Sequence, residues 1–82
     1  MDLVKIAERL DAEEKLKLKY RRFVSKGDEQ TQAVRMDKLL DVEPEQGLLF
    51  VSFDDRDIIW VRVEEAIEAL PDDGVYGEAA GH

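Results

Sequence analysis

Residues 48–70 decide the fold class: they read Leu48-Leu-Phe-Val-Ser-Phe53, then Asp54-Asp-Arg-Asp57, then Ile58-Ile-Trp-Val-Arg-Val63, then Glu64-Glu-Ala-Ile-Glu-Ala-Leu70. Two apolar runs rich in β-branched and aromatic residues flank a polar segment, which predicts a central hairpin over 48–63. The run that follows contains mostly Glu, Ala and Leu and stops at Pro71. It therefore predicts a C-terminal helix over 64–70.

The predicted hairpin is apolar on both faces. A turn at Asp55-Arg56 pairs Phe53 with Ile58 and Val51 with Trp60. An antiparallel hairpin with one solvated face carries polar side chains on that face, so each face of this one must be covered. Burial of apolar surface contributes roughly 25 cal/mol per Å², so leaving one apolar face exposed to water would lose several kcal/mol of stability. This predicts self-association through an apolar sheet face, with these candidate interface residues: Phe50, Phe53, Ile58 and Trp60.

An N-terminal helix is predicted from Asp2, which can cap it, and from Leu3, Ile6, Ala7 and Leu10, which recur on one helical face. Asp11 either ends this helix or begins a second one, because Glu14 completes a capping box.

The segment from Lys15 to Arg21 alternates between basic and apolar residues. This favours a half-buried strand with its apolar residues inward. A helix over residues 12–24 fits the apolar spacing almost as well, since Lys and Leu are good helix formers. Residues 29–40 are likewise compatible with a strand or a helix. Pro44 excludes helical geometry at Glu43 and marks a turn that continues to Gly47.

These patterns predict one small α+β domain over residues 1–71. Its centre is an antiparallel β-meander of three to five strands, with an N-terminal helix and the C-terminal helix over 64–70. Residues 72–82 hold three glycines and two alanines, which predicts a flexible tail.

Composition limits the class of protein. The chain has 82 residues, 44% hydrophobic and 39% charged, and no cysteine. A domain of this size buries only about 60% of its unfolded surface, and it has no disulfide or thiolate metal site to stabilise it. Charges interrupt the first ten residues, so neither a signal peptide nor a membrane span is predicted, and a cytoplasmic location is expected.

Charge is unevenly distributed along the chain, whose net charge is −8. Residues 15–26 contain no acid, and residues 27–82 are strongly acidic. A polyanion would meet local attraction but long-range repulsion. The candidate polyanion contacts are six basic residues: Lys15, Lys17, Lys19, Arg21, Arg22 and Lys26. A charged edge strand that resists aggregation explains the same strip without any nucleic acid.

The residues needed for catalysis are scarce. The chain has no cysteine, and His82, its one histidine, falls in the predicted tail. Asp54-Asp-Arg-Asp57 does not have the spacing of a calcium loop, and the glycines do not form a phosphate-binding loop. The sequence therefore predicts no catalytic residues, no metal and no cofactor.

A meander followed by a helix is also suggested by Val34-Arg-Met-Asp-Lys-Leu-Leu-Asp-Val-Glu43, Leu49-Phe-Val-Ser-Phe53, Trp60-Val-Arg-Val63 and Glu65-Ala-Ile-Glu-Ala-Leu70. This pattern resembles LytTR-type DNA-binding domains and certain small flagellar proteins over about half of the chain. The resemblance implies the same topology. Where such domains carry a basic C-terminal strand against DNA, this chain has an acidic, glycine-rich segment.

The function expected from the sequence is that of a small, acidic, non-enzymatic interaction or regulatory module. It is expected to self-associate and to bind a protein partner, without membrane contact. The alternative is a nucleic-acid-binding module that uses the basic strip from Lys15 to Lys26.

Overall fold

The computed structural model describes residues 1–53 and 56–78, apart from the side chain of Lys26. Its elements are α1 (Leu3–Asp11), β1 (Leu16–Lys26), β2 (Glu29–Glu43), β3 (Leu48–Phe53), β4 (Asp57–Arg62), the 3-10 turn η1 (Val63–Glu65), β5 (Ala66–Pro71) and β6 (Gly77–Glu78). The strands form one antiparallel sheet in the order β4-β3-β2-β1-β5, with β6 beside β2. The N-terminal helix and the antiparallel meander are confirmed, but the described residues form six strands rather than three to five.

Helix α1 begins where the sequence predicts. The Asp2 carboxylate accepts hydrogen bonds from the backbone N–H groups of Val4 (3.1 Å) and Lys5 (3.3 Å), which satisfies donors that have no partner within the helix. The helix ends at Asp11 and Glu13 takes a positive φ of 62°, so Asp11 does not begin a second helix. Among the described residues, no helix has the length and apolar character needed to cross a membrane.

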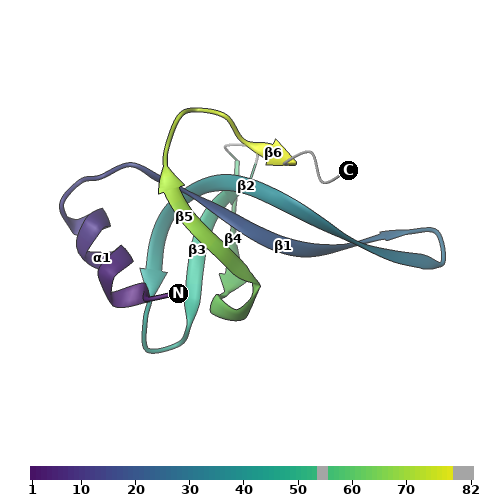
Figure 1. Cartoon of the computed structure of the whole chain (residues 1–82), viewed down its shortest axis with the longest axis horizontal. Coiled ribbons are helices and arrows are strands. Elements are labelled where there is room, and N and C mark those ends of the chain that lie inside the picture. The colour runs from purple at the N-terminus through teal and green to yellow at the C-terminus, as the bar shows by residue number, and fades with distance from the viewer. Residues whose placement is uncertain (54–55, 79–82) are drawn as a thin grey trace.

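The alternating segment from Leu16 is a strand, as the sequence favours. Leu16, Leu18 and Tyr20 point into the core, and none is more than 1% exposed. Strand β1 pairs with β2 along its whole length, from Leu16 opposite Leu39 to Lys26 opposite Glu29. Both segments for which a helix remained possible are therefore strands. Together they form a long hairpin whose far end projects beyond the rest of the sheet (Figure 1).

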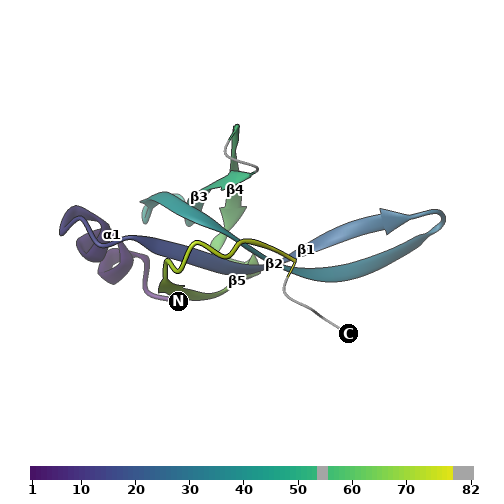
Figure 2. The same cartoon turned by 90° about the horizontal axis from the view of Figure 1, so that it is seen from above.

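The sheet is strongly bent. The register between β2 and β3 shifts between Leu39 and Asp41, and the register between β1 and β5 shifts between Lys19 and Tyr20. Such irregularities bend a strand and increase its twist. Seen from above, the β3–β4 hairpin rises out of the layer formed by β1, β2 and β5 (Figure 2).

The predicted C-terminal helix over 64–70 is wrong. Residues Val63–Glu65 form a single 3-10 turn, and β5 then pairs with β1, with Ala69 opposite Leu18. A seven-residue helix is marginal on its own, whatever its propensity. Here the open edge of β1 offers backbone hydrogen bonds, and Ala66 and Ala69 pack against the core. Tertiary pairing therefore overrides the local preference.

The hairpin over β3 and β4 is confirmed, but its predicted register is wrong by one residue. Phe53 lies opposite Asp57, Val51 opposite Ile59 and Phe50 opposite Trp60. Three residues connect the strands rather than two; Asp54 and Asp55 of this connection lie outside the described residues. Because side chains alternate along a strand, this one-residue difference exchanges the two faces of β4.

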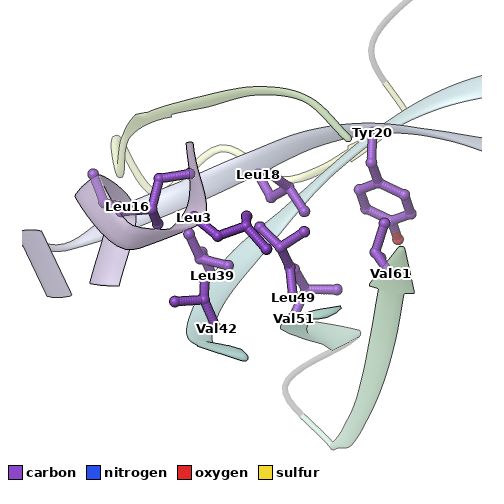
Figure 3. Packing of buried hydrophobic residues seen from close by; sticks show 10 residues of the cluster. Leu3, Leu16, Leu18, Tyr20, Leu39, Val42, Leu49, Val51 and Val61 are labelled. Carbon is purple, nitrogen blue, oxygen red and sulfur yellow. The ribbon is translucent and has the colours of Figure 1, made fainter. Parts of the chain in front are cut away.

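The core lies inside the bend of the sheet and is closed at one end by α1 (Figure 3). Helix α1 contributes Leu3 and Ile6, and every strand from β1 to β4 contributes at least one buried apolar side chain. The buried set is Leu3, Ile6, Leu16, Leu18, Tyr20, Leu39, Val42, Leu49, Val51 and Val61. A single core thus unites the helix with both hairpins.

Residues 72–78 contact the sheet, although the sequence predicts a flexible tail over 72–82. Gly77 and Glu78 pair with Met36 and Arg35 of β2. The Asp72 N–H donates to the carbonyl oxygen of Lys15 at 3.0 Å. The rest of the predicted tail, residues 79–82, lies outside the described residues.

Gly47 joins β2 to β3 with a φ of +67°, where a side chain is strained. An added Cβ would also lie 3.3 Å from Val63 Cγ1. We expect Gly47→Ala to lower the free energy of unfolding by about 2 kcal/mol. Gly27→Ala is the matched control, because Gly27 also has a φ of +67° but no atom within 4 Å of the added Cβ. We expect Gly27→Ala to lower the free energy of unfolding, measured with urea, by about 1 kcal/mol. Equal losses would show that Val63 moves aside without cost.

Candidate interaction surfaces

The solvent-facing side of the β3–β4 hairpin is apolar. Burial of Leu49, Val51 and Val61 on the inner side leaves the alternate residues pointing outward. Ile58 is 65% exposed and Trp60 is 55% exposed. We call this surface the outer face; its residues are Leu48, Phe50, Ile58 and Trp60. Three of the four predicted interface residues therefore lie together.

Phe53, the fourth predicted interface residue, lies on the opposite side of the hairpin. It shares that side with Leu49 and Val51, and two guanidinium groups lie over its ring. The distances to the ring centroid are 4.6 Å for Arg35 and 5.7 Å for Arg22. The sequence misses this placement because it depends on the register of the whole sheet.

Charges of both signs border the outer face. Strand pairing aligns Glu43, Leu48 and Arg62 in one row across β2, β3 and β4. The next row contains Asp41, followed by Phe50 and Trp60. The guanidinium of Arg62 lies 5.6 Å from the centroid of the Trp60 ring, within the range of a cation–π contact.

A hollow of about 490 Å³ opens at the Arg62 end of the outer face. It is lined by Gln46, Gly47, Leu48, Trp60, Arg62 and Glu64. The outer face is therefore uneven, with Trp60 forming part of one wall.

The predicted basic strip is divided by the fold. Lys17 is only 4% exposed, because its ammonium donates to Asp73 Oδ1 at 2.7 Å and to the carbonyl oxygen of Val75 at 3.3 Å. The hydrogen bond from Lys17 lowers the pKa of Asp73 below its ordinary value. Arg21 and Arg22 are exposed but point to opposite faces of β1, as neighbours in a strand must.

The remaining members of the strip do not form one continuous track. Lys15 is exposed and Lys19 is half-buried, with Lys17 between them paired to Asp73. Nothing is described of the Lys26 side chain.

The partner of Lys17 could have been sought from the sequence. Asp73-Gly74 is a turn dipeptide, and it was the available sequence signal that residues 72–78 turn back toward the sheet.

A groove lies between β1 and β4. Strand β5 pairs with β1 only from Leu16 to Tyr20, so beyond Tyr20 this edge of β1 has no strand beside it in the described residues. We call residues 21–26 the β1 arm. The outer edge of β4 is likewise unpaired within 1–53 and 56–78. The groove encloses about 330 Å³ and is lined by Tyr20, Arg21, Arg22, Phe23, Ile59, Trp60, Val61 and Glu65.

A buried polar cluster that the sequence did not reveal lies between β1 and β2, next to the start of the β1 arm. The Tyr20 hydroxyl donates to Asp37 Oδ2, and Arg35 Nε lies 3.7 Å from the same oxygen. The Nη1 atom of Arg35 lies 3.9 Å from Glu78 Oε1, which links the cluster to β6. Burial, reinforced by the hydrogen bond to Asp37, raises the pKa of Tyr20 to about 12.

This cluster lies inside the fold, where Arg35 Nε has no hydrogen-bond partner among the described residues. Tyr20 is 1% exposed and Asp37 is 2% exposed, so both are shielded from solvent. Among the described residues, no group of acidic or histidine side chains is arranged to hold a metal ion.

No protein-family model matches this chain, and no match was found among curated proteins or solved structures.

Proposed function

We propose that this chain is a non-enzymatic interaction module of the cytoplasm that self-associates through the outer face. The observation that carries the proposal is the exposure of Ile58 and Trp60 on the same side of the hairpin as Phe50. Aromatic residues are enriched in the buried centres of protein interfaces. A second copy that buries this face would remove its apolar surface from water, which stabilises the dimer relative to the separate chains.

Charge complementarity supports a second copy as the occupant. In a dimer whose two outer faces meet, the two-fold axis can run parallel to β3 between the faces. The row Glu43–Leu48–Arg62 then runs in the opposite direction in the second copy, and Leu48 stays at its centre. Glu43 of each copy then faces Arg62 of the other, as an isologous interface requires. Two such pairs offset part of the repulsion between chains that each carry a net charge of −8.

Sedimentation tests the proposal. We expect dimers at about 100 µM, a concentration that detects interfaces at the small end of the size range. Ile58→Asp should give monomers, because it places a carboxylate on the outer face beside Trp60. Val4→Asp is the matched control, since Val4 is 57% exposed on α1, away from the outer face. It should leave the dimer intact.

A charge exchange tests the geometry separately. Glu43→Arg alone should weaken dimerisation, because it places an arginine of one copy opposite Arg62 of the other. Glu43→Arg combined with Arg62→Glu should restore it. A wild-type chain that stays monomeric at this concentration contradicts self-association. Dimers that survive Ile58→Asp contradict the outer face as the interface.

A further inference from the structure

The groove between the β1 arm and β4 presents unpaired backbone on both walls. Each wall is a strand edge whose N–H and C=O groups lack a neighbouring strand in the described residues. Such edges are templates for the addition of another strand. Beyond Tyr20, the hairpin of β1 and β2 continues as two strands that project from the body of the sheet (Figure 2). Two strands alone are marginally stable, so a third would stabilise the arm.

The side chains along the groove favour an amphipathic strand. Phe23 is 71% exposed on the arm, and Trp60 lines the facing wall. Both rings can pack against apolar side chains of an added strand. The apolar residues of the added strand would therefore occur at alternate positions.

The charges along the groove favour an acidic strand. Arg21 and Arg22 line it, against one carboxylate, that of Glu65. Strand β1 itself contains no acid from Leu16 to Lys26. Opposite charges on facing residues of neighbouring strands stabilise pairing, whereas like charges destabilise it.

We propose that this groove binds an extended acidic segment of a partner protein, which adds as a strand to the β1 arm. The proposal rests on the interaction role proposed above but not on self-association. A short acidic strand matches the free backbone edges as well as the arginines. A nucleic acid matches only the arginines, because it has no strand backbone to pair with the free edges.

The test uses the full chain and a fluorescein-labelled octapeptide of alternating glutamate and valine. We expect saturable binding in fluorescence anisotropy. The counterpart with lysine in place of glutamate should bind at least about tenfold more weakly, because it places like charges opposite Arg22. The same weakening is expected when alternate peptide nitrogens are methylated, because methylation removes donors that strand pairing requires.

Matched variants locate the peptide. Arg22→Glu should weaken binding about fivefold, because Arg22 lies on the face of β1 opposite to Phe23 and so faces the glutamates of a peptide whose valines pack against Phe23. Lys5→Glu makes the same charge change at an exposed position on α1 and should leave the affinity unchanged. Ile58→Asp, introduced to remove self-association, should still bind the peptide, so that failure of one proposal is distinguishable from failure of the other.

Three results would overturn the proposal. The first is equal affinity for the glutamate and lysine peptides, and the second is unchanged affinity after methylation. The third is tighter binding of oligothymidine than of the acidic peptide, with a steep loss of affinity as salt increases. That last result would assign the arginines of the groove to phosphate contact.

Discussion

Leu49→Ala is expected to lower the free energy of unfolding by about 3 kcal/mol or more. Leu49 is 0% exposed at the centre of the core, so truncation removes buried methyl groups and leaves a cavity that the sheet can only partly close. A domain of this size has a total stability of about 4–12 kcal/mol. The loss is therefore a large share of the total, and urea unfolding followed by circular dichroism measures it.

Leu40→Ala is the control for this prediction. Leu40 is 39% exposed on β2 at the register shift, so its truncation should cost less than about 1 kcal/mol.

A second pair of alanine variants tests the register of the β3–β4 hairpin. Val61→Ala should cost clearly more than Ile58→Ala, because Val61 is 2% exposed and Ile58 is 65% exposed. The opposite order would show that β4 presents its other face to the core.

Stability is expected to fall sharply above pH 10 because of Tyr20. Its pKa is raised from an ordinary value of 10 to about 12 in the folded chain, chiefly by burial and then by the hydrogen bond to Asp37. The folded state therefore holds this proton more tightly than the unfolded state does. The contribution is fully present below pH 10 and is lost as the pH rises through 12. Its size is about 3 kcal/mol.

Urea unfolding at a series of pH values measures this loss against Tyr20→Phe. That variant should be less stable at neutral pH, because the buried Asp37 loses its donor. It should lack the Tyr20 part of the alkaline loss. An identical alkaline loss in Tyr20→Phe and wild type would contradict the assignment.

The elements that the sequence predicts correctly have patterns that local geometry and burial explain together. Asp2 caps α1, and the alternation of Leu16, Leu18 and Tyr20 matches the two-residue period of a strand. The two apolar runs over 48–63 form the central hairpin. In each case local preference and burial favour the same element, so no knowledge of distant residues is needed.

The predictions that fail or stay incomplete depend on residues far apart in the chain. The segment after Glu65 has the composition of a helix but becomes β5, because the open edge of β1 lies beside it. The basic strip looks continuous along the chain, yet Lys17 is paired with Asp73. No local sequence pattern predicts the cluster of Tyr20, Asp37 and Arg35, because its members come from two strands that meet only in the sheet.

For residues 48–63, the sequence alone determined that a hairpin forms and that both of its faces are apolar, because composition and turn residues specify these properties locally. Only the tertiary structure decided which face is inside. The connection is one residue longer than predicted, and pairing of β3 with β2 places Leu49 and Val51 in the core. Alternation of side chains then places Phe50, Ile58 and Trp60 on the outer side of the hairpin.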